Sequence, residues 1–464
     1  MVRFLNAYFP ARTLFLGISE ACLITLAFLA AVIVRLGTDN ASLMLGYENG
    51  FLRVLLVSAA FMGCMYYFDL YDSTVLSNRR EVFTRMILVL GTVCIVLGFL
   101  YHVYPSLGLG RSIFLSGLIL VVVLLLAWRR LFLLVNSLPQ FAQRALILGD
   151  SALAASLAEE LGARPELGVR VVGQIADFAS RNGKPAGHAS GEPVEGFLKL
   201  VQPYEADRII VALGDRRGKL PVEGLLELKT RGMRVEDGAE LYEAVTGKVP
   251  LDSLRLSWFL FSSGFRVSRP LLLYKRMLSI FLSTVGLIVA LPVMAIVALA
   301  IRLDSSGPAV FRQKRVGQNG KIFVLYKFRT MVNGSDQDEN LRPATANDCR
   351  FTRVGRILRR TRLDELPQLF NILRGDMHFV GPRPFVPNQE QECLEQIPYY
   401  RQRWAVKPGA TGWAQINRGY CATIEDNKEK LAYDLFYIRN LSIGLDLLIL
   451  FQTMKILLLG QGSR

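Results

Sequence analysis

The segment TRLDELPQLFNILRGDMHFVGPRP, residues 361–384, places two adjacent carboxylates, Asp364 and Glu365, directly before Leu-Pro. Proline is tolerated in the first turn of a helix but not in its interior, so the segment predicts a helix that begins near Asp364, continues through QLFNILR (368–374) and stops at Gly375. Both carboxylates then lie at a helix N-terminus, where free N–H groups and the helix dipole favour anions. A plain N-cap at Asp364 is one interpretation of this pattern.

The two carboxylates are expected to have separate tasks. Successive side chains on a helix diverge by about 100°, so Asp364 and Glu365 should not share one proton. One carboxylate could hold a divalent cation while the other meets an electrophile. The choice between a cap, a metal site and a reactive group depends on what the rest of the chain brings near them.

Cationic residues surround this pair in the sequence. GRILRRTR (355–362) supplies four arginines, Arg359 among them, and helical spacing turns some of them toward the carboxylates. A solvated or lipid-headgroup face is the alternative for the others. Arg383 is held between Pro382 and Pro384, a stiff setting that suits bidentate recognition of phosphate, with a plain turn as the alternative.

Two further segments extend this set. YKFRTM (326–331) places Lys327 and Arg329 on a predicted strand, and KPGATGWAQIN (407–417) joins a turn to an aromatic residue and two amides. Carboxylates, a divalent cation and several phosphate-binding cations beside apolar segments together favour phosphoryl chemistry on an anionic lipid.

The apolar segments crowd the first third of the chain. The 464 residues carry a formal charge of +15 and are 52% hydrophobic, with a mean hydropathy of +0.32. Four segments are long enough, at about 20 residues, to cross a bilayer: 13–35, 51–70, 84–103 and 111–135. A cleavable signal peptide is not predicted, because no small-residue cleavage site precedes a polar region. Most flanking arginines fall on one side of a four-span topology, which places the N-terminus and everything after residue 140 in the cytoplasm.

A fifth apolar segment, 277–301, is expected to enter and leave the membrane by the same face. Pro292 interrupts it and bends the helix, and basic residues flank it on both sides, as cytoplasmic flanks do. A plain membrane span is the alternative. Near the C-terminus, residues 441–460 carry Asp446 and Lys455 in an apolar run, which favours a helix lying at the interface.

Residues 141–265 predict a Rossmann-like domain. Apolar strands at 144–150, 169–177 and 207–215 alternate with helical segments, which indicates a small doubly wound α/β fold. The turn that starts at Gly149 keeps the first glycine of a phosphate turn. Serine replaces the second glycine, whose role in such turns is to let a pyrophosphate approach the backbone. A structural or regulatory module is therefore favoured over a dinucleotide-binding one.

The predicted fold is a membrane protein of mixed α and α/β class. Residues 1–140 form a four-helix transmembrane bundle, 141–265 the Rossmann-like cytoplasmic domain, and 266–464 a monotopic catalytic α/β domain with a re-entrant helix over about 271–303. Six cysteines without a C-x-x-C pair and only three histidines predict no disulfide framework, zinc site or histidine triad. The basic balance beside apolar runs indicates anionic lipid or phosphate partners and no nucleic acid. The middle domain is a reasonable place for a homodimer contact.

Several long motifs resemble the bacterial sugar transferases known as polyprenyl-phosphate phosphoglycosyl transferases. The similar segments are FRQKRVGQNGKIFVLYKFRTM (311–331), RRTRLDELPQLFNILRGDMHFVGPRP (359–384) and KPGATGWAQIN, within residues 270–464. The apolar segments and the α/β domain resemble the larger members, which initiate O-antigen or exopolysaccharide synthesis. Residues 216–265 are similar to exopolysaccharide transferases associated with the PEP-CTERM system.

This resemblance implies that Asp364 attacks the β-phosphate of a UDP-sugar, that UMP leaves, and that undecaprenyl phosphate takes the phosphosugar from a covalent aspartyl intermediate. It implies Glu365 as a Mg²⁺ ligand, Arg359 as a phosphate-binding residue and Arg383 as a contact to the nucleotide-sugar. Other residues expected near the substrate are Lys327, Arg329, Gln368, Asp376 and Pro382. The expected location is the bacterial inner membrane, with its lipid as a partner and both termini cytoplasmic.

Two positions depart from the family pattern. The family's re-entrant helix breaks at Ser-Pro, whereas this chain has Leu291-Pro292, so the bend is retained but a hydroxyl that could bond a freed carbonyl is lost. The family carries serine where this chain has His378. A core position is the plain interpretation of His378, and a pH effect on activity is the alternative.

Two other classes of function combine similar parts. A membrane nucleotide-sugar dehydratase or epimerase would need an intact glycine fingerprint and a Tyr-x-x-x-Lys motif, yet none of the sixteen tyrosines has lysine four residues on. A non-catalytic scaffold of a polysaccharide-export complex would leave the carboxylate–arginine set without a purpose. The residues therefore favour a phosphoglycosyl transferase.

Overall fold

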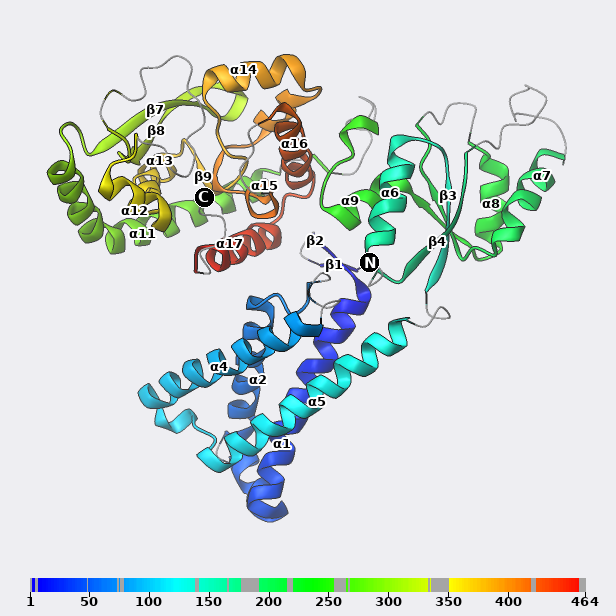
Figure 1. Cartoon of the computed structure of the whole chain (residues 1–464), viewed down its shortest axis with the longest axis horizontal. Coiled ribbons are helices and arrows are strands. Elements are labelled where there is room, and N and C mark those ends of the chain that lie inside the picture. Colours follow the sequence, from blue (N-terminus) through cyan, green and yellow to red (C-terminus); the bar gives the residue numbers. More distant parts are fainter. Residues whose placement is uncertain are drawn as a thin grey trace. The chain divides into compact units, whose positions relative to one another are not determined.

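The structure is a computed structural model of the chain. It describes residues 2–4, 7–47, 49–72, 75, 79–137, 142–164, 167–176, 192–214, 220–253, 264–265, 268–332, 334, 350–418 and 423–458. The chain divides into two compact units, one mainly Tyr8–Gly238 and the other mainly Ala239–Arg464 (Figure 1). The division falls before the predicted domain boundary at residue 265, so residues 239–253 belong to the second unit.

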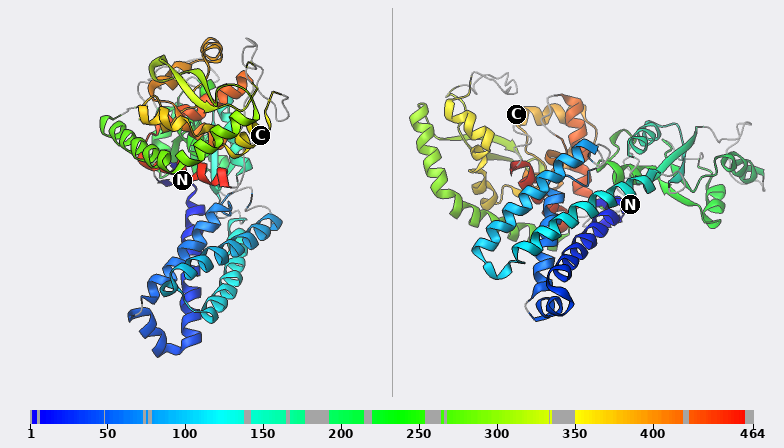
Figure 2. Two further views of the ribbon diagram at one scale, coloured as in Figure 1. Left: turned by 90° about the vertical axis from the view of Figure 1, so that its left-hand side faces the viewer. Right: turned by 60° about the horizontal axis from the view of Figure 1, so that its bottom comes forward.

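Long apolar helices form the first part of the first unit. They are α1 (Ala11–Tyr47), α2 (Gly50–Tyr67), α4 (Arg79–Val103) and α5 (Arg111–Ser137). All four are long and apolar enough to cross a membrane, and they pack together as a bundle (Figure 2). Short strands β1 (Val2–Phe4) and β2 (Ala7–Phe9) precede the bundle, and the 3₁₀ helix η1 (Pro105–Leu107) lies between α4 and α5. These helices correspond to the four segments predicted from hydropathy.

The bundle has an apolar core with an ion pair buried in it. Phe28 and Phe61 are fully buried there and lie ring to ring. Glu20 of α1 and Arg129 of α5 are also buried, with 2.6 Å between Arg129 Nε and Glu20 Oε1. Arg129 also donates to the carbonyl oxygen of Leu70 at 3.2 Å. The pair thus joins α1, α5 and the turn after α2.

A four-stranded parallel sheet forms the second part of the first unit. Its strands lie in the order β4 (Val169–Ile175), β3 (Gln143–Leu148), β5 (Arg208–Val211) and β6 (Arg234–Asp237). Helices α6 (Ala152–Ala163), α7 (Glu192–Val201) and α8 (Val222–Thr230) accompany the sheet (Figure 1), with η4 (Gln202–Tyr204) after α7. β3 and β5 are apolar and largely buried, as strands inside a parallel sheet are. This arrangement confirms the predicted parallel α/β domain.

The second unit combines a long apolar helix with short strands and helices. α9 (Gly238–Thr246) and η5 (Leu251–Ser253) precede the long helix α11 (Arg269–Asp304). An antiparallel hairpin follows, made of β7 (Val310–Val316), η6 (Gln318–Gly320) and β8 (Ile322–Phe328). The strands β9 (His378–Val380) and β10 (Gly409–Thr411) pair in parallel. The remaining helices are α12 (Arg353–Thr361), η7 (Leu363–Glu365), α13 (Gln368–Arg374), α14 (Pro387–Gln396), η8 (Tyr400–Ala405), α15 (Trp413–Asn417), α16 (Ile424–Arg439) and α17 (Ile443–Leu458).

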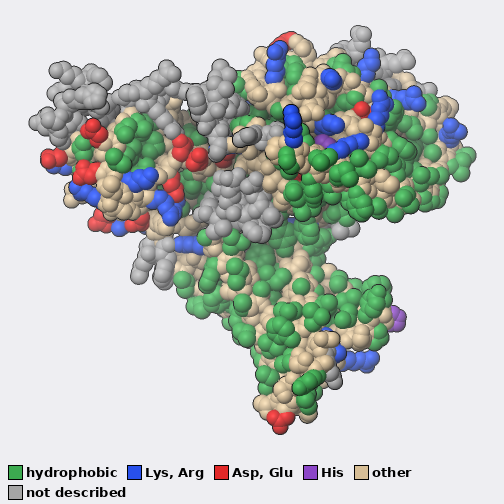
Figure 3. Space-filling model, turned by 180° about the vertical axis from the view of Figure 1, so that it is seen from behind, with side chains coloured by type: hydrophobic (Ala, Val, Ile, Leu, Met, Phe, Trp, Pro, Cys, Tyr) green, Lys and Arg blue, Asp and Glu red, His purple; other side chains and the backbone are tan. Residues whose placement is uncertain are grey.

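α11 contains the segment that the sequence predicts to be re-entrant. It is one continuous helix with Pro292 in its interior, and its ribbon changes direction along its length (Figure 2). Its buried side includes Lys275, Ser279 and Ser283 at four-residue spacing, which puts them on one face. The rest of the helix exposes large apolar side chains, such as Ile288. Hydrophobic side chains also cover one side of the second unit in the space-filling view (Figure 3).

The charged residue Asp446 of α17 is held inside the second unit. Asp446 is buried and accepts a hydrogen bond from Lys275 Nζ at 2.6 Å and another from the Tyr437 hydroxyl at 2.7 Å. Lys275 Nζ also donates to the carbonyl oxygen of Val380 at 3.4 Å. Asp446 therefore ties α17 to the start of α11 and the end of β9. The exposed side of α17 is apolar, with Phe451 among its residues.

The buried ion pair of the bundle yields a stability prediction. Replacing Arg129 by Met leaves the Glu20 carboxylate buried without its partner, which should lower the stability of the full chain by about 3–5 kcal/mol. The thermal midpoint of detergent-solubilised protein measures this loss. The double variant Glu20→Met/Arg129→Met should recover most of it, because no unpaired charge remains. Equal midpoints for the single and double variants would contradict the prediction.

Candidate active site

The two predicted carboxylates lie in a turn between two helices. α12 ends at Thr361, Arg362 adopts a left-handed conformation with φ 56°, and the 3₁₀ turn η7 then carries Asp364 and Glu365. α13 starts at Gln368, with Pro367 at its N-cap and no side-chain cap hydrogen bond. The plain N-cap interpretation of Asp364 therefore does not hold. The predicted stop at Gly375 is confirmed, since this residue has φ 97° at the C-cap.

Both ends of α11 hold this helix–turn–helix segment. Near the start of α11, Arg276 donates to the carbonyl oxygens of Ile372 and Leu373, at 2.8 and 2.7 Å, and so caps the C-terminus of α13. At the end of α11, the Asp304 carboxylate accepts the backbone N–H of Val354 at 3.1 Å and caps the N-terminus of α12. The turn with the two carboxylates is thus fixed from both sides by one apolar helix.

Glu365 sits among cations. Lys327 Nζ lies 3.4 Å and Arg383 Nη2 3.5 Å from its Oε1 atom. Burial alone would raise the pKa of Glu365, but the positive charges of Lys327 and Arg383 outweigh burial and lower the pKa to about 2. Burial also lowers the pKa of Lys327 from its usual range. The Glu365 carboxylate is therefore charged at any physiological pH.

Asp364 has a different environment from its neighbour. Burial raises the pKa of its carboxyl group above the ordinary aspartate value, and the nearby charges of Lys327 and Arg359 only partly offset this effect. The Arg359 guanidinium lies over the Phe351 ring, 4.4 Å from its centroid. A partly desolvated carboxylate with a raised pKa is a better nucleophile than one fully solvated or ion-paired.

The loop that carries Arg383 is held by its backbone. Gly409 donates its N–H to the Pro382 carbonyl oxygen and Arg315 donates to that of Pro384, both at 3.0 Å. Arg403 donates to the carbonyl oxygen of Arg383 itself. The Arg383 side chain is thus left to point toward Glu365 from a fixed backbone, as expected of a phosphate-binding fork.

The structure brings only some of the predicted site residues together. The cluster contains Asp364, Glu365, Lys327, Arg359 and Arg383, with Pro382 in its backbone support. Arg329 instead donates to the carbonyl oxygens of Ser305 and Ser306 at 2.7 Å and caps the C-terminus of α11. Asp376 accepts a hydrogen bond from Asn371 at the end of α13, and Gln368 is buried at its start. Pro292 lies inside α11.

Arg315 is a member of the cluster that the sequence analysis missed. In the register of the hairpin, Phe311 opposes Lys327, so Arg315, four residues along the same strand, lies on the face of Lys327. Burial and the charge of Arg383 lower the pKa of Arg315 to about 10, and Glu365 is also among its charged neighbours. Side chains alternate between the two faces of strand 310–316, but this alternation places Arg315 on the face of Lys327 only when the hairpin register is known.

His378, one of the two departures from the family pattern, is buried. Its Nδ1 atom lies 3.1 Å from the Ser279 hydroxyl of α11. Burial and the charges of Lys275 and Lys407 lower the pKa of His378 to about 3. The core interpretation of this residue fits its position, and the imidazole is neutral at physiological pH.

The carboxylate pair fits a magnesium ion only together with a phosphate ligand. Among the described residues, no group of three or more His, Cys, Asp or Glu side chains could hold a metal by itself. Asp364 and Glu365 offer two adjacent carboxylates, and Mg²⁺ is typically bound by one or two carboxylates plus substrate phosphate oxygens. Oxygen ligands from a bound phosphate would therefore be needed to complete a Mg²⁺ site at this pair.

The phosphate turn of the first unit is closed by its own backbone. A Cβ atom at Gly149 would come within 2.4 Å of the Ala212 carbonyl oxygen, and the Ser151 hydroxyl donates to the same oxygen at 2.6 Å. Ser151 also caps α6. The turn is thus packed against Ala212, and the hydroxyl at the position of the second glycine is already hydrogen-bonded within the domain.

Comparison with known proteins finds two family models that match parts of this chain. Residues 271–460 match the family model "Bacterial sugar transferase", and residues 66–219 match "CoA-binding domain". The chain is 31% identical over 342 residues to a UDP-glucose:undecaprenyl-phosphate glucose-1-phosphate transferase of Xanthomonas campestris pv. campestris, covering 69% of this chain and 67% of the relative. The chain belongs to the bacterial sugar transferase family.

Two further relatives match shorter stretches of the chain. A UDP-N-acetylgalactosamine-undecaprenyl-phosphate N-acetylgalactosaminephosphotransferase of Aeromonas hydrophila is 38% identical over 226 residues, which is 48% of this chain and 52% of the relative. A UDP-glucose:undecaprenyl-phosphate glucose-1-phosphate transferase of Klebsiella pneumoniae is 45% identical over 184 residues, 39% of each chain. The chain therefore spans about half or less of the length of these two relatives.

The buried histidine predicts a stability that depends on pH. The unfolded chain takes up a proton at His378 below its ordinary pKa of 6.5, whereas the folded chain does so only near 3. Stability should therefore fall as the pH drops below 6.5, by about 2 kcal/mol at pH 5. The thermal midpoint of the full chain against pH measures this slope. In His378→Asn, which keeps a polar partner for Ser279 but cannot titrate, the slope should be shallower; an unchanged slope would contradict the prediction.

The different settings of two arginines predict different losses of stability. Arg329→Gln removes a charged donor from the end of α11 and should cost about 2 kcal/mol or more. Arg383→Gln removes a partly exposed side chain whose main partner, Glu365, keeps Lys327, so its cost should stay below about 1 kcal/mol. Thermal midpoints of the two matched variants test this difference. A larger loss of stability in Arg383→Gln than in Arg329→Gln would contradict the structural role given to Arg329.

Proposed function

We propose that the chain transfers a sugar 1-phosphate from a UDP-sugar to undecaprenyl phosphate and releases UMP, as the first membrane step of exopolysaccharide or O-antigen synthesis. The observation that carries this proposal is the contrast within the carboxylate pair. Asp364 is half-buried with a raised pKa, whereas Glu365 is held in its charged form by Lys327 and Arg383. Relatives named as transferases acting between UDP-sugars and undecaprenyl phosphate support this substrate pair.

The reaction takes place in two displacements at one carboxylate. An oxygen of Asp364 forms a bond to the β-phosphorus of the UDP-sugar, the bond to the bridging oxygen breaks, and UMP leaves with that oxygen. A phosphate oxygen of undecaprenyl phosphate then attacks the same phosphorus and the bond to Asp364 breaks, which restores the carboxylate and yields undecaprenyl diphosphate-sugar. Covalent catalysis lets one pocket serve a soluble donor and a membrane acceptor in turn.

The cations of the cluster bind and orient the phosphates. Arg383 and Arg359 receive phosphate oxygens from either side of the carboxylate turn, and Lys327 and Arg315 add positive charge behind it. Glu365, with the pyrophosphate oxygens of the donor, would hold Mg²⁺, which neutralises charge on the phosphates when bound. Because Glu365 has a pKa of about 2, its carboxylate is available to the metal throughout the working pH range.

The proposed topology has four membrane spans and a re-entrant α11, with both termini in the cytoplasm of a bacterial inner membrane. The distribution of arginines supports the four spans. For α11, the support comes from its two ends: Arg276 and Asp304 both bond to the α12–α13 segment. Two ends that hold one compact segment are expected on the same side of a bilayer, which supports an α11 that enters the membrane and returns.

The covalent step is testable with labelled donor. Detergent-solubilised wild-type protein with Mg²⁺ and UDP-sugars, beginning with UDP-glucose and UDP-N-acetylgalactosamine, should release UMP and, without undecaprenyl phosphate, retain ³²P from the β-phosphate. Asp364→Asn should lose both signals by at least about 10³-fold, because no nucleophile remains. The same change at exposed Asp207, in the first unit, is the control and should keep both. No UMP from any donor, or full activity in Asp364→Asn, would overturn the proposal.

A further inference from the structure

A segment before the sugar transferase match packs onto the catalytic part of the chain. The segment is residues 239–253, here named the strap, and the family match begins only at residue 271. The strap lies along α16: Val249 donates its N–H to the Ala432 carbonyl oxygen at 3.1 Å, and Lys428 Nζ lies 2.7 Å from the Asp252 carboxylate. The strap is therefore a structural part of the second unit.

The strap contacts the start of α15 through a hydrogen bond and close packing. Trp413, the first residue of α15, donates its indole N–H to the Gly247 carbonyl oxygen at 2.9 Å. Its ring stacks on Phe436 of α16, with 5.6 Å between centroids. Gly247 has φ +67°, and a Cβ atom there would lie 3.1 Å from the Trp413 ring. Both the left-handed backbone and the close approach require glycine at this position.

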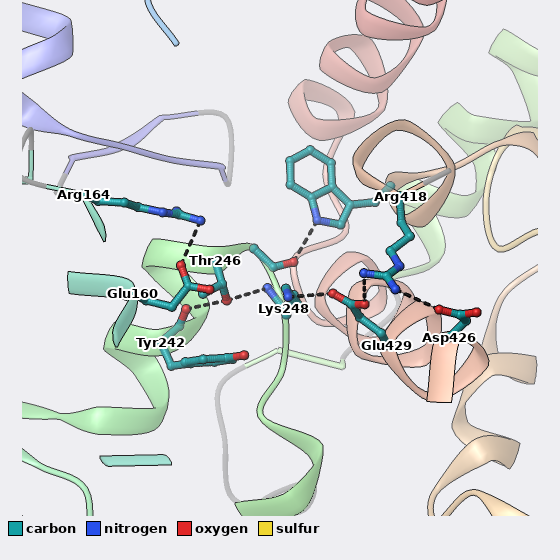
Figure 4. A network of polar contacts seen from close by, with 10 residues as sticks. Glu160, Arg164, Tyr242, Thr246, Lys248, Arg418, Asp426 and Glu429 are labelled. Atoms are coloured by element: carbon teal, nitrogen blue, oxygen red, sulfur yellow. Dashed lines mark hydrogen bonds and ion pairs between the residues drawn. The ribbon is translucent and has the colours of Figure 1, made fainter. Parts of the chain in front are cut away.

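The strap is also connected to the end of α15. Lys248 Nζ lies 2.7 Å from the Glu429 carboxylate, and the other oxygen of Glu429 pairs with Arg418, the residue after α15. Arg418 also binds Asp426 at 2.8 Å. Figure 4 shows these side chains converging, with Glu429 between Lys248 and Arg418. Two adjacent strap residues, Gly247 and Lys248, thus act on both ends of one short helix.

From α15 the connection to the active site is short. Gly412 alone separates α15 from β10. β10 pairs with β9, Gly381 donates its N–H to Thr411 at 2.9 Å, and Gly409 donates to Pro382 at 3.0 Å. Pro382 precedes Arg383, the cation beside Glu365. A shift of α15 would therefore move the backbone from which the Arg383 fork is presented.

We propose that the strap is a positioning element of the active site, in which Gly247 and Lys248 hold α15 so that β10 fixes Arg383 for the phosphates of the donor. This inference rests on the proposed function, because it assigns the effect to donor binding. Trp413 and Gly247 are positioning residues: they touch no reacting atom and act through β10. The catalytic part of this chain thus begins at the strap rather than at the start of the family match.

Three variants of the full chain test the strap. Gly247→Ala strains a left-handed residue and presses on Trp413, and Trp413→Phe deletes the indole donor while keeping a stacking ring. Gly232→Ala is the matched control, because Gly232 also has a positive φ, +92°, but nothing lies within 4 Å of its Cβ position. The KM for the UDP-sugar should rise about tenfold in the first two variants, with the KM for undecaprenyl phosphate unchanged and the control at wild-type values.

Hydrogen exchange separates failure of the inference from failure of the proposed function. The backbone amides of Gly381 and Gly409 should lose protection at least about tenfold in Gly247→Ala and Trp413→Phe but not in Gly232→Ala, whether or not any donor is turned over. Wild-type protein without UMP release would sink the proposed function alone. Wild-type activity with unchanged donor KM and unchanged exchange in both strap variants would overturn the inference.

Discussion

The attachment of both ends of α11 to one helix–turn–helix segment is the constraint on which the second unit depends. Arg276 supplies positive charge to the C-terminal carbonyls of α13, and Asp304 supplies negative charge to the N-terminal amides of α12. Each contact satisfies backbone groups that a helix end leaves unpaired. Because both contacts originate on one helix, α11 fixes the position of the carboxylate turn. A polar site is thus positioned by an apolar helix.

The same constraint explains the electrostatics of the turn. A helix start enclosed by α11, α12 and the β7–β8 hairpin is partly desolvated, and desolvation raises the pKa of a carboxyl group unless cations compensate. Glu365 has that compensation from Lys327 and Arg383, whereas for Asp364 burial prevails. Two neighbouring carboxylates in one site thus have pKa values shifted in opposite directions, and this difference supports the separate roles proposed for them.

Local rules sufficed where the chain itself fixes the geometry. Gly375 located the end of α13, and hydropathy located the long helices and three of the parallel strands. The helix start predicted near Asp364 is wrong, because the carboxylates lie in the 3₁₀ turn η7 and α13 begins at Gln368. Roles that depend on tertiary partners were out of reach. Arg329 is two residues from Lys327 in one motif, yet it caps α11 while Lys327 faces Glu365. The burial of Asp446 could not be predicted, because its partner, Lys275, lies 171 residues earlier. Sequence periodicity assigns a residue to one face of a helix or strand, but its contacts are determined by tertiary packing.

The turn after β3 shows how the first unit packs at one end of its sheet. Gly149 approaches the Ala212 carbonyl oxygen so closely that a Cβ atom would not fit, and the Ser151 hydroxyl donates to the same oxygen. The same sheet leads without any intervening residue from β6 into α9 at Gly238, whose Cβ position lies 2.9 Å from the Val211 carbonyl oxygen. Gly238, the first residue of α9, therefore packs closely against the sheet of the first unit.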